Sequence, residues 1–417
     1  MTSVFIHNFG CRVNQAEAFD WVDRLNQAGV TVVRDIKRAD LVVINACALT
    51  ASAEADVRQF VRKVRREAPG AKIILTGCLS DKTREEIVKS GAVSLLIPNT
   101  RKDTLVEELL KLTGAARAGF QKTAFRSRAL LKVQDGCDSH CTFCIIPSLR
   151  GRSRSRPLEQ VVECARAVVE RGYQEVVLAG IHLCAYGKDF QPPLSLLDLL
   201  KALVKIPGLK MIRLSSLDPR LLPQPLLEFI VGEEKICPHF HLSLQHASPA
   251  VLRRMGRKST PEEYFEILNF LRKGRPEASL GADIIVGFPG ESDSDFEFLK
   301  NFLQNSPLNY FHVFSYSPRA GTPAASWEPV PASVRKKRSA ELRRLSREKN
   351  LAFRKLFAGK EVPGIVIRKK EKTAEVLTGN YIKVMVEGRE DLRPGEYVRV
   401  RIVEVGPVQA KGEVVDG

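Results

Sequence analysis

The chain has 417 residues, of which 44% are hydrophobic and 27% are charged, so it is long enough for about three domains that each bury a core. It contains no apolar run of about 18 residues, and it does not begin with a basic region followed by an apolar stretch, so we expect a cytoplasmic protein with neither a membrane span nor a signal peptide. The net charge of +17 indicates a polyanionic partner, and without a membrane anchor a nucleic acid is favoured over a lipid surface.

The first 115 residues repeat one pattern three times. Short, β-branched apolar runs end in Cys11, Cys47 and Cys78, and each run is followed by a helix-like segment. This pattern predicts an α/β domain with a parallel sheet over residues 1–115, in which the carboxyl ends of the strands share one edge. The chain has nine cysteines, an odd number, which in a reducing compartment favours metal binding over disulfides. We therefore expect the three thiols to converge as ligands; three buried core cysteines are the alternative.

Residues 125–330 alternate six further strand candidates with helical segments. Six β-α units in about 190 residues predict a partial, TIM-like (β/α)6 barrel. Enzymes with this fold build their sites where the strands end. The strand candidates are residues 129–136, 175–183, 211–217, 239–246, 280–288 and 310–317.

The first barrel strand leads into the sequence DGCDSHCTFC. Its C-x3-C-x2-C spacing places Cys137, Cys141 and Cys144 on one tight loop. Three cysteines can hold a 4Fe-4S cluster that keeps one iron without a protein ligand, so that a substrate or a cofactor can bind there. Zinc, with His140 as the fourth ligand, is the alternative.

A basic helix is predicted over residues 331–357 and an all-β segment over residues 358–417. Residues 335–372 contain 15 Lys/Arg and 4 acidic residues, which amounts to +11 of the net charge. Small β-barrels often bind nucleic acid, so we expect this region to bind RNA. A solvated helix face is the alternative.

The cysteine loop, with Phe143 just before its last cysteine, resembles that of the radical S-adenosylmethionine (SAM) enzymes. The three N-terminal cysteines, the segments RLSSLDP, DIIVGFPGES and FSYSPRAGTPAA, and a C-terminal segment similar to a TRAM domain extend the resemblance to the methylthiotransferases over nearly the whole chain. GCRVNQAE and IHLCAYGKD resemble the subgroup that acts on threonylcarbamoyl-adenosine. Cys184, His246 and Ser153 depart from that subgroup, and all three lie outside the six expected ligands.

The resemblance implies two 4Fe-4S clusters with different partners. The cluster at the barrel loop would bind SAM, and the cluster at the N-terminal cysteines would offer its open iron to the inserted sulfur. The expected SAM-binding residues are Gly180, Gln245, Gly287 and Glu291. For Glu291, an acid favoured by the dipole at a helix start is the alternative.

Arginines follow the cysteine loop at the same edge of the barrel. Arginine suits bidentate contacts with phosphate, and proteins that read RNA favour unpaired loop bases, so an anticodon stem-loop is the expected ligand. Solvated loop arginines are the alternative. The expected RNA-binding residues are Arg150, Arg152, Arg154, Arg156, Arg335, Lys336, Lys337 and Arg338.

The resemblance thus implies a tRNA methylthiotransferase that adds a methylthio group to C2 of N6-threonylcarbamoyladenosine next to the anticodon. It also implies an electron donor such as flavodoxin or ferredoxin, and a source of sulfur. One alternative is action on isopentenyl-adenosine of tRNA or on an aspartate of a ribosomal protein. The other is an iron–sulfur protein that binds RNA without catalysis.

Overall fold

The N-terminal domain is built on a five-stranded parallel sheet with the strand order β2-β1-β3-β4-β5. The structure is a computed structural model that describes residues 2–113 and 126–415. Helices α1 and α4 cover one face of the sheet, and α2 and α3 cover the other, so the central strand β3 is mainly apolar and is buried along its whole length. The elements are β1 (Ser3–Asn8), α1 (Arg12–Gln27), β2 (Thr31–Val32), β3 (Leu41–Ala46), α2 (Ala51–Glu67), β4 (Lys72–Gly77), α3 (Asp81–Lys89), β5 (Leu95–Leu96) and α4 (Leu105–Thr113).

The central domain confirms the predicted partial barrel. Six parallel strands and one short antiparallel strand, β7, form two hydrogen-bonded sheets. Their strand orders are β7-β6-β8-β9 and β10-β11-β12. An isolated bridge between Leu217 and Leu242 joins the two sheets. The strands are β6 (Ala129–Asp135), β7 (Arg154–Ser155), β8 (Glu175–Gly180), β9 (Met211–Leu214), β10 (His239–Gln245), β11 (Ser279–Val286) and β12 (Tyr310–Ser315).

Helices on the outside of these strands enclose the largest core of the molecule. Reciprocal hydrogen bonds cap α7, α10 and α11, where a serine or threonine before each helix pairs with an acid three residues later. The helices are α5 (Ile146–Arg150), α6 (Leu158–Glu170), α7 (Leu196–Leu203), α8 (Gln224–Gly232), α9 (Pro249–Arg254), α10 (Pro261–Gly274) and α11 (Asp293–Asn305).

The long basic helix α12 (Ala332–Lys355) packs along β11 and β12 and leads into a closed β-barrel of five strands. The barrel closes through the antiparallel pair β13–β16 and the parallel pair β15–β17. This confirms the small C-terminal β-barrel predicted from the sequence. Its strands are β13 (Glu361–Lys370), β14 (Thr373–Thr378), β15 (Lys383–Glu387), β16 (Tyr397–Val405) and β17 (Ala410–Val415).

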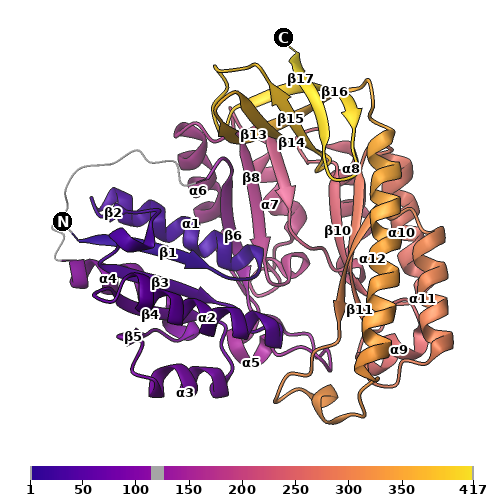
Figure 1. Cartoon of the computed structure of the whole chain (residues 1–417). Helices are drawn as coiled ribbons and strands as arrows, with labels where there is room; N and C mark the ends of the chain where they lie inside the picture. The colour runs from indigo at the N-terminus through magenta and orange to yellow at the C-terminus, as the bar shows by residue number, and fades with distance from the viewer. Residues whose placement is uncertain (1, 114–125, 416–417) are drawn as a thin grey trace.

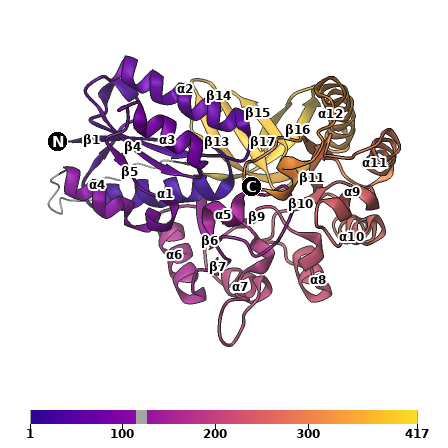
Figure 2. The same cartoon turned by 90° about the horizontal axis from the view of Figure 1, so that it is seen from below.

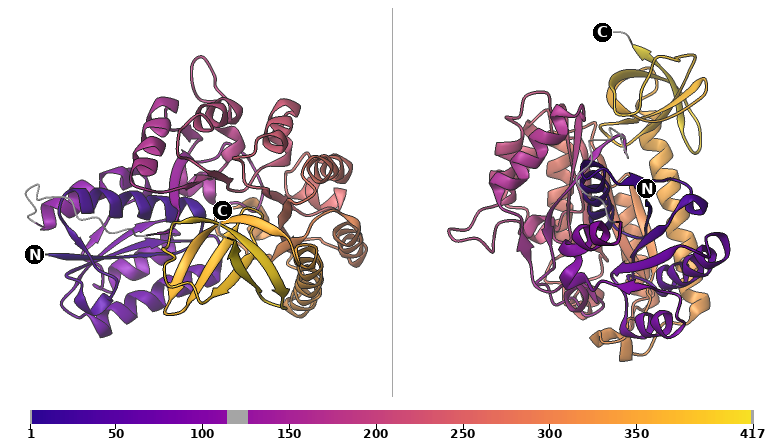
Figure 3. Two further views of the ribbon diagram at one scale, coloured as in Figure 1. Left: turned by 90° about the horizontal axis from the view of Figure 1, so that it is seen from above. Right: turned by 90° about the vertical axis from the view of Figure 1, so that its left-hand side faces the viewer.

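The N-terminal domain lies beside β6, and α10, α11 and α12 lie at the opposite side of the central strands (Figure 1). Helix α1 packs against both its own sheet and β6, as the view from below shows (Figure 2). The C-terminal β-barrel lies at the end of α12 (Figure 3). It is fastened to the central strands by Arg213, which donates to the carbonyl oxygens of Gly379 at 2.8 Å and Thr378 at 3.2 Å. Among the described residues, no helix is long and apolar enough to span a bilayer.

Candidate functional site

The three N-terminal cysteines lie just beyond the carboxyl ends of β1, β3 and β4. The turn after β1 passes directly over Cys47: Gly10 has a φ of +85°, and a Cβ at this position would lie 2.5 Å from the Cys47 Sγ. Asn14 ties the β1 and β3 ends together by donating to the carbonyl oxygens of Phe9 at 2.9 Å and Ala46 at 2.8 Å. The fold therefore brings together three thiols that are far apart in the sequence.

Burial and mutual proximity set the charge state of these thiols. Burial, together with the nearby Cys11 and Cys78 thiols, raises the pKa of Cys47 to about 11. Burial also raises the pKa of Cys78. Thiols of this kind stay protonated at neutral pH unless a cation replaces the proton, so metal binding here would release protons.

The second triplet lies on the loop that follows β6. Cys137 accepts a backbone N–H from Ser139 at 3.4 Å, and its Sγ is 3.6 Å from Nδ1 of His182. The other ring nitrogen of His182 is 3.2 Å from the Asp218 carboxylate. Burial would raise the pKa of Cys137, but the contacts from His182 and Ser139 leave it lowered. His182 and Asp218 thus form a pair next to an expected cluster ligand, which the spacing of the cysteine motif alone does not single out.

The donor set of each triplet fits an iron–sulfur cluster. Structural zinc sites usually have four protein ligands, whereas three cysteine thiolates can hold a 4Fe-4S cluster and leave one iron for an external ligand. Each triplet offers three free thiols for this purpose.

Arg150 lies between the two triplets and not on the surface. Its side chain is 0% exposed, and its Nε donates to the Cys78 Sγ at 3.1 Å. Its guanidinium also pairs with Glu17 at 3.1 Å and Asp135 at 2.8 Å and donates to the Asn14 side chain. The prediction that Arg150 binds RNA is therefore wrong, because four protein partners occupy this guanidinium.

Glu17 is the counter-charge at the centre of this region. Its carboxylate contacts Arg150, Lys102 at 2.5 Å and Lys132 at 3.3 Å, and all of these side chains except Lys132 are almost fully buried. Burial disfavours the charged form of Glu17, but the three cations hold its pKa well below the ordinary value. The buried charges therefore compensate one another, which a charge buried at this depth requires.

Two of the predicted residues in α12 also have roles inside the protein. Arg338 is buried and pairs with Glu291 at 2.7 Å and Asp293 at 2.7 Å, so the RNA contact predicted for Arg338 is wrong as well. Arg335 is partly buried, lies over Gly287 and donates to the Tyr316 carbonyl at 2.7 Å. The remaining predicted RNA-binding residues are at least partly accessible: Arg152, Arg154, Lys336 and Lys337 are exposed, and Arg156 is intermediate.

The prediction that Glu291 binds SAM is wrong, because protein groups occupy its carboxylate. Its Oε2 accepts the backbone N–H groups of Gly287 at 2.7 Å and Phe288 at 3.2 Å, and its Oε1 pairs with Arg338. The side chain is fully buried, so Glu291 stabilises the turn at Gly287 and does not contact SAM.

The other three predicted SAM-binding residues lie at carboxyl ends of barrel strands. Gly180 ends β8, where a Cβ would lie 3.0 Å from the Leu183 Cα, so the backbone here is closely packed. Gln245 ends β10 in the left-handed region, with a φ of +72°, and Gly287 follows β11 with a φ of +69°. For the non-glycine residue Gln245, such a backbone conformation is uncommon and indicates a local constraint.

Two family models match separate parts of the chain. The radical SAM superfamily matches residues 131–303, and a family described as uncharacterized protein family UPF0004 matches residues 3–97. Curated relatives described as threonylcarbamoyladenosine tRNA methylthiotransferase MtaB are 34–38% identical to this chain. The relative from Aquifex aeolicus is 38% identical, and the match covers 96% of this chain and 100% of the relative.

A second kind of relative is more distant. A tRNA-2-methylthio-N(6)-dimethylallyladenosine synthase from Fervidobacterium nodosum is 32% identical over 87% of each chain. Among solved structures, the radical SAM methyltransferase TsrM from Kitasatospora setae superimposes with a TM-score of 0.57 at 12% identity, covering 78% of this chain and 77% of TsrM. At that identity the likeness supports the fold alone.

Proposed function

This chain belongs to the MtaB-type family of radical SAM methylthiotransferases, and we propose that it adds a methylthio group to C2 of N6-threonylcarbamoyladenosine next to the anticodon of tRNA. The observation that carries the proposal is the pair of three-thiol sites joined through Arg150. One site lies on the barrel that matches the radical SAM family, and the other lies on a separate sheet. Two open cluster sites in one chain suit a reaction that needs both SAM and a sulfur atom.

In this proposal, Cys137, Cys141 and Cys144 hold one 4Fe-4S cluster, and Cys11, Cys47 and Cys78 hold the other. When bound, the first cluster supplies the electron that cleaves SAM, and the second supplies a site for the transferred sulfur. His182, held by Asp218, orients the Cys137 thiolate. Gly180, Gln245 and Gly287, at the carboxyl ends of their strands, are the proposed SAM-binding residues, and Glu291 holds the Gly287 turn in place.

We propose that the exposed cations Arg152, Arg154, Lys336 and Lys337, with the partly exposed Arg156, contact the phosphates of the anticodon stem-loop. The C-terminal β-barrel adds a second RNA-binding surface.

The proposed functional units are the N-terminal α/β domain (residues 1–115), the radical SAM barrel (125–330), the basic helix (331–357) and the C-terminal β-barrel (358–417). A cytoplasmic location, a flavodoxin or ferredoxin as electron donor and a separate source of sulfur complete the proposal.

Mass spectrometry of tRNA nucleosides from a strain that lacks the protein tests this function. We expect loss of the 2-methylthio derivative of threonylcarbamoyladenosine and its return when the gene is restored. Loss of the methylthio derivative of isopentenyl-adenosine, or of a modified ribosomal protein aspartate, would assign the chain to another substrate. A purified protein that does not bind SAM under anaerobic conditions would indicate an RNA-binding iron–sulfur protein without catalysis.

A further inference from the structure

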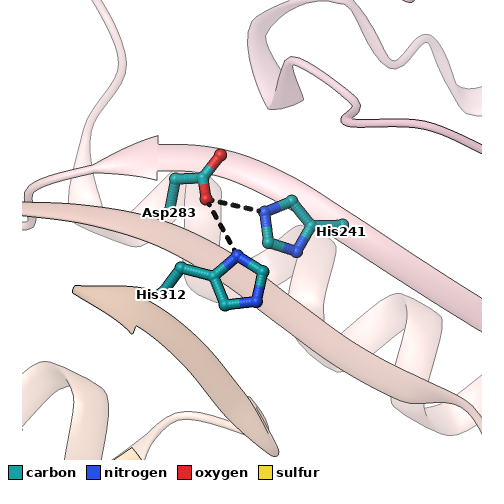
Figure 4. A group of neighbouring side chains, drawn as sticks. All are labelled: His241, Asp283 and His312. Atoms are coloured by element: carbon teal, nitrogen blue, oxygen red, sulfur yellow. Dashed lines mark ion pairs between the residues drawn. The ribbon is translucent and has the colours of Figure 1, made fainter. Parts of the chain in front are cut away.

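Three polar side chains meet inside the barrel, one from each of the strands β10, β11 and β12 (Figure 4). Nε2 of His241 lies 3.0 Å from Oδ1 of Asp283, and Nδ1 of His312 lies 3.4 Å from the same oxygen. Both imidazoles therefore converge on one carboxylate oxygen. Neither the cysteine sites nor the SAM-binding residues proposed above involve these three side chains.

The alternation of side chains along the strands shows which way this group faces. The neighbours of the three residues along the strands belong to the core beneath the outer helices: Phe240, Leu242, Ala282, Ile284, Phe311 and Val313. Because successive side chains in a strand point to opposite faces, the group faces the interior of the barrel. Gln245 ends the same strand four residues further toward its carboxyl end, beyond an irregularity in the pairing of β10 with β11 between Leu242 and Gln245. The group therefore lies nearer to the amino ends of the strands than the proposed SAM site does.

A hydrogen-bonded tyrosine holds His241 in place. The hydroxyl of Tyr310 lies 3.1 Å from Nδ1 of His241 and 2.8 Å from Nε2 of His239. Burial, with the nearby Arg213, lowers the pKa of His239 far below its ordinary value, and burial raises the pKa of Tyr310. Both groups are therefore neutral. Gly281 makes room for this arrangement, since a Cβ there would lie 2.1 Å from the Tyr310 ring.

The outer part of the group has two unused polar atoms. Within residues 2–113 and 126–415, Oδ2 of Asp283 and Nε2 of His312 have no hydrogen-bond partner. The His312 side chain is 59% exposed and that of Asp283 is 26% exposed, so a ligand inside the barrel can reach both. Burial disfavours the Asp283 carboxylate, but the two imidazoles hold its pKa well below the ordinary value. Asp283 therefore presents an ionised acceptor beside a ring nitrogen.

We infer that Asp283 and His312 bind the threonylcarbamoyl side chain of the substrate nucleoside, with His241 as a positioning residue. The inference rests on the proposed function and names the part of the protein that recognises that substrate. A threonylcarbamoyl group carries a hydroxyl and ureido N–H donors, which suit the free oxygen of Asp283. It also carries a carboxylate, which suits an N–H at Nε2 of His312 when that imidazole is protonated. An isopentenyl group carries none of these polar atoms.

Anaerobic binding assays with two RNAs test the inference. One is an anticodon stem-loop with threonylcarbamoyladenosine, and the other is the same stem-loop with unmodified adenosine; fluorescence anisotropy gives the affinity for each. We expect the wild-type protein to prefer the modified RNA. His312→Asn keeps a donor near Nδ1 for Asp283 but removes Nε2, so it should lose about 10-fold of this preference, in line with one hydrogen bond to a charged group.

Two further variants and a control sharpen the test. His312→Gln places an amide nitrogen near the position of Nε2 and should keep most of the preference, whereas Asp283→Asn should lose it. Phe298→Ala, at an exposed position on α11 outside the barrel, should behave as the wild type. Equal preference for the modified RNA in wild type, His312→Asn and Asp283→Asn would overturn the inference.

A divalent cation is the competing occupant, since the three ligand atoms lie within 4.8 Å of one another. One zinc or other divalent ion per chain beyond the cluster iron, lost in His312→Asn, would show a metal site and overturn the inference. Failure of the proposed function would look different: the wild-type protein would make no methylthiolated threonylcarbamoyladenosine. A wild type that makes this product, with a His312→Asn variant that keeps its RNA preference, contradicts the recognition site alone.

Discussion

Nε of Arg150 lies 3.1 Å from Sγ of Cys78, although the two residues belong to different domains and are 72 positions apart. Arg150 ends the short helix α5 that follows the barrel cysteine loop, and Cys78 follows β4 of the N-terminal sheet. One buried side chain therefore connects the loop of one proposed cluster to a ligand of the other. Hydrogen bonds to ligand sulfur atoms are among the means by which proteins tune cluster potentials.

Replacing Arg150 should disturb both the fold and the N-terminal cluster. Arg150→Met removes the most deeply buried cation next to Glu17 and Asp135 and leaves Lys132 to pair with both; removing one partner of a buried charge pair costs about 3–5 kcal/mol. We expect a lower unfolding temperature under anaerobic conditions and a shifted potential of the N-terminal cluster in an electrochemical titration followed by electron paramagnetic resonance. Arg152→Met, at a position with a 93% exposed side chain, is the control and should change neither. An unchanged potential in a stable Arg150→Met protein would show that the contact with Cys78 has no electronic effect.

The number of irons should depend on each cysteine triplet separately. Anaerobic reconstitution should give about eight irons per wild-type chain, since each 4Fe-4S cluster contributes four. Cys141→Ala should reduce the iron content by half, while Cys164→Ala, outside both triplets, should leave it unchanged. Full iron retention in Cys141→Ala, or stoichiometric zinc in the wild type, is incompatible with the two-cluster assignment.

The exposed cations of α12, and not its buried ones, should bind RNA. Replacing both Lys336 and Lys337 with Glu should weaken tRNA binding and reduce the salt dependence of the binding constant by a slope of about two, one for each lost phosphate contact. The matched control replaces Arg66 and Lys89, two exposed cations of the N-terminal domain, with Glu. Filter binding over a range of salt concentrations measures both. Equal losses in the two double variants would mean that net charge alone, and no particular surface, governs the affinity.

Acid should loosen the contact between the N-terminal domain and the loop after β12. Glu54 pairs with Arg319 at 2.7 Å, and both side chains are buried. Burial disfavours the ionised form, but Ser80 and Arg319 lower the pKa of Glu54 below its ordinary value of 4.5. Because the folded pKa is the lower one, the pair stabilises the protein above pH 4.5, and this stabilisation is lost as the pH falls through the folded pKa.

Glu54→Gln should therefore lower the unfolding temperature at pH 7, at a cost of about 1–3 kcal/mol for a buried group without its charged partner. The difference between variant and wild type should disappear well below pH 4.5. Thermal unfolding of the iron-free protein, followed by circular dichroism, measures this. A difference that persists unchanged at pH 3 would rule out ionisation of Glu54 as its cause.

Motif spacing predicted the cysteines because their chemistry depends on local order: a C-x3-C-x2-C loop, and a cysteine at the end of each of three parallel strands. The arginines were harder to assign. Lys336, Lys337 and Arg338 are consecutive in the sequence, but the helix turns Arg338 inward, where Glu291 and Asp293 bind it. Likewise, no local pattern pairs Arg150 with Glu17, which lies 133 residues away. Which charges are buried depends on tertiary packing, and the sequence around each charge does not reveal it.

The most direct test of the whole account separates the two triplets in one reaction. Cys11, Cys47 and Cys78 are replaced together by Ala, and 5′-deoxyadenosine and digested tRNA nucleosides are separated by chromatography after reaction with SAM, tRNA and dithionite. If the barrel triplet cleaves SAM and the N-terminal triplet serves the sulfur, this variant should still form 5′-deoxyadenosine and should form no methylthiolated nucleoside. The corresponding variant of Cys137, Cys141 and Cys144 should form neither. Methylthiolated threonylcarbamoyladenosine at near wild-type yield from the N-terminal variant would contradict the account, because the first domain would then be only a scaffold.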